Sequence, residues 1–175
     1  MDKMIELLQD KLPEFEVVPI SKKNVCDVWE MMKGNEYFYS RTQDHEVTRK
    51  ECVDDITALP PGKGLEDKTY VGIYEGSELI AAVDLIAGYP DEKTEYLGLL
   101  ILAVPKHGLG IGKKILDVIT TSAKEKGFEY IELACHKTNE IGFAFWSKNG
   151  FEVIRTSERN IDGKVYTLLS MRKQI

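Results

Sequence analysis

Apolar residues follow two different periods along the chain. Between residues 69 and 104 they form nearly continuous runs rich in Val, Ile, Leu and Tyr, which is typical of strands buried in a sheet. From Ile111 onward they recur every three or four residues, which predicts an amphipathic helix that ends before Gly127. The chain therefore mixes strands and helices.

The remaining elements follow from the same patterns and from turn residues. Helices are predicted from Asn24 or Ser21 to Gly34, over Thr48–Leu59 with a capping box of Thr48 and Glu51, and over Asn139–Lys148; the segment 34–40 is predicted as a loop. Strands are predicted over residues 15–20, 69–74, 78–87, 95–104, 130–135, 151–159 and 164–172. Asp162-Gly163 favours a type I′ hairpin turn. This order predicts one mixed α/β domain over residues 1–175.

Composition narrows the class of protein. The 175 residues are 43% hydrophobic and 30% charged, which excludes disordered and collagen-like chains. The net charge of −6 argues against bulk nucleic-acid binding. Three separated cysteines favour neither a disulfide framework nor a zinc site, and we expect no metal. No signal-peptide or membrane-spanning stretch is seen, so we expect a cytoplasmic protein without a membrane partner.

Three glycines alternate between the last long apolar run and the helix after it. Gly108, Gly110 and Gly112 allow the backbone to turn sharply, and the start of the helix directs its N–H groups outward, which favours a phosphate. Lys106, Lys113 and Lys114 add positive charge there. The spacing fits neither a Walker A loop nor the GxGxxG fingerprint. A packing turn without a ligand is the alternative.

Two motifs together resemble the signatures of the GCN5-related N-acetyltransferases. The first, (Arg/Gln)-x-x-Gly-x-(Gly/Ala), is matched by Gly110-x-Gly112, with His107 in place of Arg or Gln. The second is matched by Asn139, with Gly142 for the usual Ala and Trp146 for the usual Tyr, and ends in Gly150-Phe151. The resemblance covers about residues 69–172, whereas the first 60 residues match only in the order of elements.

The resemblance implies a fold and a cofactor. The fold is a mixed, mostly antiparallel sheet of about seven strands with helices on both faces and splayed central strands. The cofactor is acetyl-CoA, and residues 69–175 would form the core that binds it. The residues implied in its binding are Leu100, Leu102, His107, Gly108, Leu109, Gly110, Ile111, Gly112, Lys113, Asn139 and Trp146.

The resemblance also implies the reaction, which is attack of a free amine on the thioester. The family usually supplies a proton to the leaving thiolate from a Tyr where this chain has Trp146, whose indole cannot do so. Tyr37, Tyr39 or a water could replace that tyrosine, and the attacking amine itself is a further source of the proton. Asp84, an acid inside an apolar strand, and Glu95 are candidate bases, although a satisfied or solvent-facing Asp84 remains open.

The first 68 residues are predicted to hold the acceptor. Glu36, Tyr37 and Tyr39 could surround a cationic amine, or the aromatic segment could simply pack on the core. The predicted function is N-acetylation of a small-molecule or peptide amine, without a nucleic-acid partner and with a possible homodimer. A CoA-binding regulatory module without catalysis and an unrelated phosphate-binding α/β protein are the alternatives.

Overall fold

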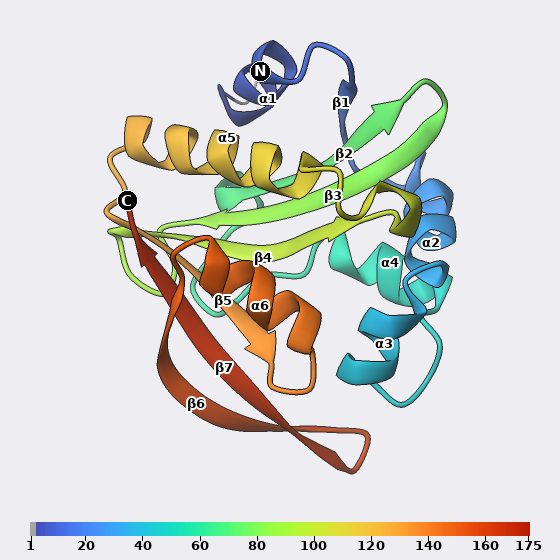
Figure 1. Ribbon diagram of the computed structural model, residues 1–175, viewed down its shortest axis with the longest axis vertical. Coiled ribbons are helices and arrows are strands. Elements are labelled where there is room, and N and C mark those ends of the chain that lie inside the picture. Colours follow the sequence, from blue (N-terminus) through green and yellow to red (C-terminus); the bar gives the residue numbers. More distant parts are fainter. Residues whose placement is uncertain (1–2) are drawn as a thin grey trace.

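Seven strands form one sheet in the computed structural model, which describes residues 3–175 (Figure 1). Their order across the sheet is β1-β2-β3-β4-β5-β7-β6. The strands are β1 (Glu16–Pro19), β2 (Lys68–Glu75), β3 (Glu78–Ala87), β4 (Thr94–Leu102), β5 (Tyr130–His136), β6 (Glu152–Ile161) and β7 (Lys164–Gln174). The helices are α1 (Lys3–Lys11), α2 (Val25–Lys33), α3 (Glu36–Thr42), α4 (Arg49–Asp55), α5 (Ile111–Glu125) and α6 (Glu140–Lys148), with short 3₁₀ turns η1 (Leu65–Asp67) and η2 (Val104–Lys106).

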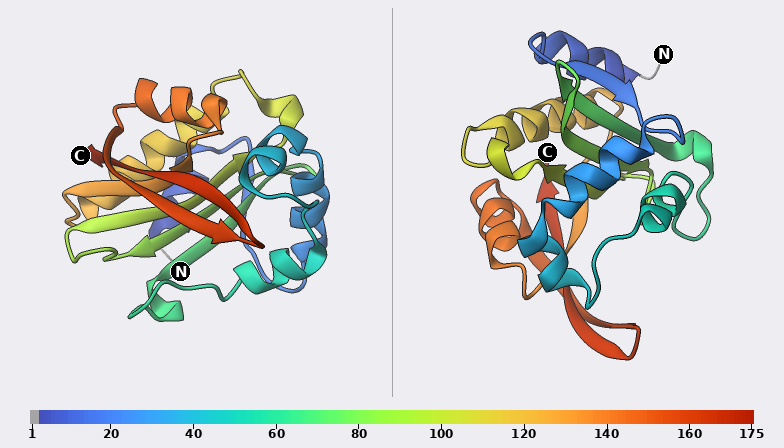
Figure 2. Two further views of the ribbon diagram at one scale, coloured as in Figure 1. Left: turned by 90° about the horizontal axis from the view of Figure 1, so that it is seen from below. Right: turned by 90° about the vertical axis from the view of Figure 1, so that its right-hand side faces the viewer.

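Helices cover both faces of this sheet, as the sequence predicts (Figure 2). One apolar core packs α1 and α5 against the sheet and includes Leu8, Ile115 and Ile119. The other packs α2 and α4 against the opposite face and includes Val28 and Cys52. Strand β3 is buried on both faces because it lies between these two cores, which explains its almost unbroken apolar sequence.

Several predicted local signals are confirmed. The Thr48 side chain accepts a hydrogen bond from the N–H of Glu51, whose carboxylate accepts one from the N–H of Thr48, so the capping box is present. Asp162 and Gly163 have φ values of 52° and 85°, as the two central residues of a type I′ turn require. These signals are local in sequence, which is why they can be recognised there.

Two helix predictions need correction. The segment predicted as a loop at residues 34–40 is mostly helix, because α3 spans Glu36–Thr42; buried Asn35 precedes it and donates from its side chain to the carbonyl of Met31. The helix predicted over Thr48–Leu59 ends at Asp55. Pro60 disfavours helical backbone at Leu59, directly before it, which accounts for the loss of helix at the predicted end but not for the stop as early as Asp55. Helix α1 was not among the predicted elements.

The only parallel pair in the described sheet is β4 with β5, and it is short. It joins Thr94 to Tyr130, Glu95 to Ile131 and Tyr96 to Glu132, and beyond Tyr96 the two strands no longer pair. Both strands nevertheless continue, β4 to Leu102 and β5 to His136. The predicted splay of the central strands is therefore confirmed, and it divides the sheet into β1–β4 and β5–β7.

Within residues 3–175, no helix is both long enough and apolar enough to cross a membrane.

Candidate active site

The free edge of β4 borders the gap between the splayed strands. The N–H of Ala103 donates to the carbonyl of Ile80 in β3, so Ala103 faces β3. Because backbone groups alternate along a strand, those of Leu102 and Leu100 face the opposite edge, where β5 no longer pairs. Both leucine side chains are half-buried although they lie in a central strand. The two residues predicted to contact acetyl-CoA thus line the gap.

His107 anchors the following loop to this edge. Its Nε2 lies 3.0 Å from the carbonyl oxygen of Leu102, a distance at which the ring N–H donates a hydrogen bond to that oxygen. The side chain is therefore folded back on β4, and its backbone N–H donates to the carbonyl of Val104 at 3.1 Å, so His107 positions the loop and offers a ligand no free backbone N–H. A histidine can make this contact where the family motif has Arg or Gln, because all three side chains carry N–H donors.

The loop after His107 exposes backbone at the start of α5. Gly108 and Gly110 have φ values of +74° and +80°, a conformation that side chains disfavour, and nothing lies within 4 Å of where a Cβ would stand. Gly110 is the N-cap of α5 and makes no side-chain cap. The first N–H groups of α5 are thus without intrahelical partners, and the helix dipole favours an anion there. This arrangement fits a pyrophosphate.

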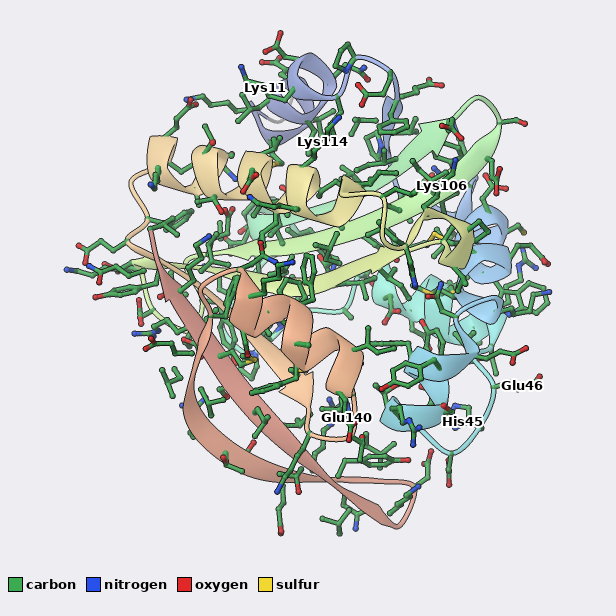
Figure 3. The ribbon with its side chains drawn as sticks, viewed as in Figure 1. Lys11, His45, Glu46, Lys106, Lys114 and Glu140 are labelled. Carbon is green, nitrogen blue, oxygen red and sulfur yellow. The ribbon has the colours of Figure 1, made fainter. Side chains whose placement is uncertain are left out.

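The expected positive charge of this loop is largely engaged elsewhere. Lys106 forms an ion pair with Glu75, Lys113 lies 2.7 Å from Asp117, and Lys114 lies 3.2 Å from Glu14 (Figure 3). The three lysines thus lie at the loop, as the sequence predicts, but each is paired with a carboxylate. Backbone N–H groups and the α5 dipole are what the loop offers an anion.

Asn139 caps α6 and retains a free donor. Its Oδ1 accepts a hydrogen bond from the N–H of Gly142 at 3.0 Å, as the helix-capping alternative expects. Its Nδ2 makes no hydrogen bond among residues 3–175. A Cβ at position 142 would lie 2.4 Å from Nδ2 and clash with it. Gly142, which stands where the family motif has Ala, therefore leaves space for the Asn139 amide. The amide can cap the helix and donate to a ligand together.

Trp146 belongs to an aromatic cluster beside the gap. Its ring contacts Phe145 and Phe151 edge-to-face, with centroids 4.9 and 5.4 Å away, and it is half-buried against the core shared with α5. Phe145 in turn would lie 3.5 Å from a Cβ at Gly112. The indole therefore acts as an apolar wall, and its N–H is no substitute for a phenol.

Asp84 lies on the other face of β3, opposite a bulge in β4. Leu97 pairs with Leu85 and Leu99 with Asp84, so Gly98 is the extra residue. A Cβ at Gly98 would lie 3.3 Å from Oδ2 of Asp84, which shows how closely this carboxylate approaches the bulge. Gly98 is exposed, an unusual state for the middle of a central strand. The bulge therefore opens the sheet to solvent next to Asp84.

The negative charge of the Asp84 carboxylate is partly neutralised by a lysine with a buried side chain. Lys68 Nζ, whose side chain is 3% exposed, donates to Asp84 Oδ2 at 2.6 Å, while Oδ1 is buried without a partner among residues 3–175. Burial raises the pKa of Asp84 to about 6, against the lowering effect of Lys68. The acid is therefore mostly ionised at neutral pH yet able to take up a proton.

Tyr39 and Tyr70 extend this buried polar cluster toward α4. Burial raises the pKa of both hydroxyls, and nearby acids, above all Asp55, raise them further. The hydroxyl of Tyr70 is buried without a partner among the described residues. Both tyrosines therefore remain protonated. Tyr70 interacts electrostatically with both Asp84 and Tyr39, so Tyr39 is linked to Asp84 through Tyr70.

A family model decides what this geometry belongs to. The model described as "Acetyltransferase (GNAT) family" matches residues 29–151, more than half of the chain. This protein is a member of the GNAT acetyltransferase family. The match includes the GNAT loop, the splayed strands and Asp84, so the family resemblance expected from the two motifs is confirmed.

Two curated relatives share parts of this GNAT chain. It is 27% identical to tRNA(Met) cytidine acetyltransferase TmcA of Pyrococcus abyssi over 115 residues, which are 63% of this chain and 14% of that protein. It is 35% identical to spermidine N(1)-acetyltransferase of Thermoplasma acidophilum over 89 residues, which are 50% of this chain and 52% of that protein. The chain thus spans about half or less of the length of these relatives.

Solved structures share the GNAT fold. An acetyltransferase from Thermus thermophilus has a TM-score of 0.70 and 19% identity, with 92% of this chain and 97% of that chain covered. PaiA N-acetyltransferase from Thermoplasma acidophilum, in complex with coenzyme A, has a TM-score of 0.65 and 21% identity, with 92% and 99% covered. At these identities the likeness shows the fold, and it confirms the predicted fold class.

Three candidate residues lie away from the GNAT site. Glu95 is 1% exposed, faces α5 and pairs with Lys126 at 2.9 Å, at the end of β4 that still pairs with β5. Tyr37 is about half a turn from Tyr39 on α3 and stacks under Arg41, with 5.1 Å between guanidinium carbon and ring centroid. Glu36 is exposed in the first turn of α3. The structure does not bring these side chains to Asp84.

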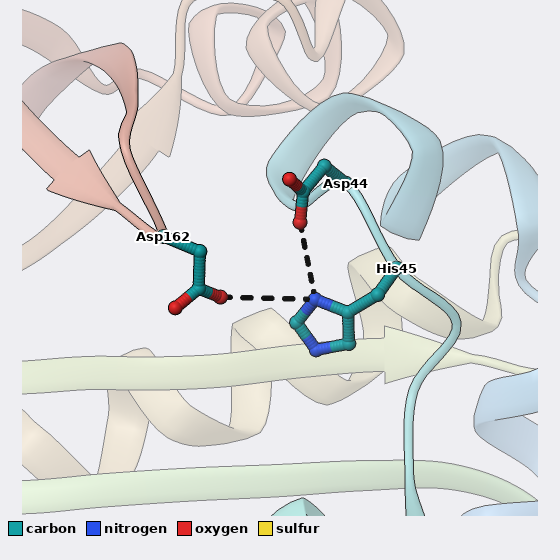
Figure 4. A group of neighbouring side chains, drawn as sticks. All are labelled: Asp44, His45 and Asp162. Carbon is teal, nitrogen blue, oxygen red and sulfur yellow. Dashed lines mark hydrogen bonds and ion pairs between the residues drawn. The ribbon is translucent and has the colours of Figure 1, made fainter.

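Asp44, His45 and Asp162 offer possible metal ligands at the surface (Figure 4). Their ligand atoms lie within 4.8 Å of one another, and all three residues are exposed. His45 also pairs through Nε2 with Glu51 at 2.8 Å, and the hydrogen bonds to Glu51 and Asp44 raise its pKa. Each ring nitrogen of His45 already lies beside a carboxylate, so hydrogen bonds and ion pairs account for the arrangement of this group.

Sequence reasoning missed Lys68, Tyr70 and Asp55. Lys68 and Tyr70 are two residues apart in β2, so their side chains lie on the same face, and this spacing can be seen in the sequence. The sequence does not reveal, however, that β2 pairs with β3 so that both residues lie near Asp84. Asp55 ends α4 and reaches the cluster only because α4 packs on this face. Their shared position is a property of the tertiary fold.

Proposed function

We propose that this GNAT protein transfers the acetyl group of acetyl-CoA to a primary amine. The observation that carries the proposal is the gap between β4 and β5, bordered by unpaired backbone of β4 and continued by the glycine loop. An extended pantetheine arm suits such a strand edge, since it can pair with backbone as an added strand does. Bound acetyl-CoA would supply an acyl group activated as a thioester.

The residues that would hold acetyl-CoA divide along its length. The N–H groups of the loop and first turn of α5, from Gly108 to Lys113, are suited to the pyrophosphate, whereas that of His107 donates to Val104. The backbone of Leu100 and Leu102 suits the pantetheine arm and the acyl end, and the free Nδ2 of Asn139 suits the arm's amide oxygens. Trp146 would pack along the bound molecule as an apolar wall.

Asp84 is the proposed base. An amine attacks only when it is deprotonated, and it arrives at neutral pH mostly as an ammonium ion. Asp84 lies beside the exposed bulge at Gly98 and has a pKa of about 6, so it can accept the ammonium proton directly or through a water. Lys68 keeps the carboxylate ionised by its hydrogen bond.

Tyr39 is the proposed proton donor. Its pKa is raised by burial and by neighbouring acids, so the hydroxyl stays protonated and available to donate a hydrogen bond. It would serve in the role for which Trp146 is unsuited. Glu95 has no part in the proposed reaction, since it faces α5 and pairs with Lys126.

A CoA-binding regulatory module is the second candidate. Trp146 at the usual tyrosine position favours it, and so does the ion pair that already engages Asp84. Both functions require CoA binding, so binding alone does not separate them. A cytoplasmic location and a homodimer remain predictions.

Turnover with a panel of amines tests the proposal. Wild-type protein, acetyl-CoA and each amine are incubated, and free thiol is measured against a no-amine blank. We expect amine-dependent thiol release that Asp84→Asn abolishes and that Asp117→Asn, a change at an exposed α5 carboxylate, preserves. Tight acetyl-CoA binding without thiol release for any amine would support the regulatory module instead.

A further inference from the structure

Basic and aromatic side chains meet on the hairpin side of the sheet, and the proposed reaction uses none of them. Arg159 of β6 lies opposite Tyr166 of β7. The Tyr166 ring contacts His136, the last residue of β5, edge-to-face with 5.4 Å between centroids. The three side chains thus form one group, which we call the hairpin cluster, at the end of the gap where β4 and β5 are apart.

The hairpin cluster and Asp84 share a face of the sheet. Paired residues lie on the same face, and so do residues two apart in one strand. Tyr96 pairs with Glu132, which has the same alternation in β5 as His136. Tyr96 also pairs with Ile86, which has the same alternation in β3 as Asp84. Gly98 and Ala134 lie on β4 and β5, between Asp84 and the hairpin cluster, and both are exposed. This face is therefore open to solvent in the middle of the sheet.

The hairpin cluster contains three polar groups without a hydrogen-bond partner among the described residues. Tyr166 is 5% exposed, and its hydroxyl is buried without a partner among residues 3–175; the same is true of His136 Nδ1. The exposed Arg159 guanidinium makes no hydrogen bond or ion pair in that part of the chain. Buried polar groups normally have partners, so two adjacent exceptions beside a free guanidinium indicate a missing hydrogen-bond acceptor with negative charge.

Nearby Arg155 differs from Arg159 in being engaged. Its Nη2 donates to Ser170 Oγ at 3.2 Å and lies 4.0 Å from Glu132. A carboxylate therefore lies near Arg155, whereas none in the described part of the chain pairs with Arg159. The opposite end of the open face carries Asp84 and Asp55, which attract a cation. A molecule lying across this face meets acid at one end and an arginine at the other.

The spacing of the two ends decides the size of that molecule. β3 and β6 are four steps apart in the sheet order, which is about 19 Å at the usual strand spacing, and the splayed step between β4 and β5 adds to this distance. After the reach of both side chains at least roughly 10 Å remain, which takes about three or more residues of extended peptide. A free amino acid carries its amine and carboxylate on one carbon atom and does not reach both ends.

Resting on the acetyltransferase function proposed above, we propose that the acceptor is a peptide or polypeptide N-terminus. Its α-amine lies at Asp84, and an acidic group about three residues along is bound by Arg159, Tyr166 and His136. The hairpin cluster is then a specificity site for the acceptor, separate from the residues that hold acetyl-CoA.

Three matched peptide amides test this assignment: Ala-Gly-Asp-Gly, Ala-Gly-Asn-Gly and Ala-Gly-Lys-Gly. With wild-type protein we expect a KM about tenfold lower for the Asp peptide than for the Asn peptide, at similar kcat, since a charge-assisted hydrogen bond is lost. Arg159→Gln should remove that difference, and Arg159→Glu should favour the Lys peptide. Lys124→Gln, which removes an equal charge from α5, should retain the wild-type preference.

Tyr166→Phe separates binding from folding. The hydroxyl has no partner in the described chain, so its removal should leave the thermal midpoint unchanged or higher while raising KM for the Asp peptide. Equal KM values for the Asp and Asn peptides, or a clear preference for free glutamate over every peptide, would overturn the proposal. Thiol release from any other amine in that case leaves the acetyltransferase function standing, whereas no release from any amine removes that function itself.

Discussion

The proposed donor side, which would bind acetyl-CoA, is built from backbone groups, whereas the proposed acceptor side is built from side chains. The donor side consists of backbone: the edge of β4 at Leu100 and Leu102, and the N–H groups between His107 and α5. Its lysines are engaged with carboxylates. The proposed acceptor side consists of side chains from separate elements, with Asp84 on β3, Tyr39 on α3 and Arg159 on β6.

This difference explains what each side tolerates. A backbone site depends on glycine conformations and strand spacing, so most side chains around it can vary while a cofactor of constant shape still binds. A side-chain site changes its preference with single substitutions, which suits an acceptor that differs between relatives. The two curated relatives are named for cytidine and for spermidine acceptors, in keeping with that view.

The largest effect is expected from a side chain placed in the backbone-built loop. Gly110→Glu adds a negative charge where phosphate is expected and requires a φ of +80° that Glu disfavours, so CoA affinity should fall about 100-fold or more. Isothermal titration with CoA measures this. Gly110→Asn is the control, because Asn tolerates left-handed backbone without the charge. Equal losses in the two variants would argue against an anion at this loop.

On the acceptor side the largest effect should come from the base. Asp84→Asn should lower kcat by about 100-fold or more while CoA affinity stays within about twofold, since proton transfer is lost and the loop is untouched. In the wild type, kcat/KM for the amine should fall as pH drops through about 6, because Asp84 is then protonated. A flat pH profile from 5 to 8 would remove Asp84 from this role.

A smaller change is expected at the boundary between the two sides. Trp146→Tyr should raise kcat by about threefold to tenfold if Tyr39 is a poorer donor than the usual tyrosine of the family, since a hydroxyl then lies beside the gap. Trp146→Phe is the control, because it keeps an aromatic wall without adding a hydroxyl. Equal kcat for wild type and Trp146→Tyr would mean that proton donation does not limit turnover.

The smallest effect is expected at His45, which fastens the acceptor-side loop after α3. Its pKa is raised by hydrogen bonds to Glu51 and Asp44, so the stabilisation is fully present below about pH 6.5 and is lost as pH rises above it. His45→Gln should lower the thermal midpoint slightly at pH 5.5 and leave it unchanged at pH 8.5. A similar shift at both pH values would assign His45 a packing role instead.

The local backbone of the proposed donor side could largely be predicted from the sequence, and the proposed acceptor side only in part. Gly108, Gly110 and Asn139 carry their meaning in local spacing, and the structure gives the two glycines left-handed backbone and makes Asn139 the N-cap of α6. Asp84 was recognisable as an acid among apolar residues, but its partner Lys68 lies across a ladder whose register the sequence does not reveal. Glu95 was the second candidate base, and its position at the paired end of β4 against α5 is visible only in three dimensions.

The short ladder between β4 and β5 has a mechanical consequence. Only three residue pairs join the two halves of the described sheet, β1–β4 and β5–β7, so the β4–β5 ladder can serve as a hinge between them. Amide protons on the free edge of β4, such as that of Leu100, lack the shielding that a neighbouring strand gives and should exchange with deuterium quickly. A molecule bound in the gap would slow this exchange and connect the two halves of the sheet, so that they unfold in one cooperative transition.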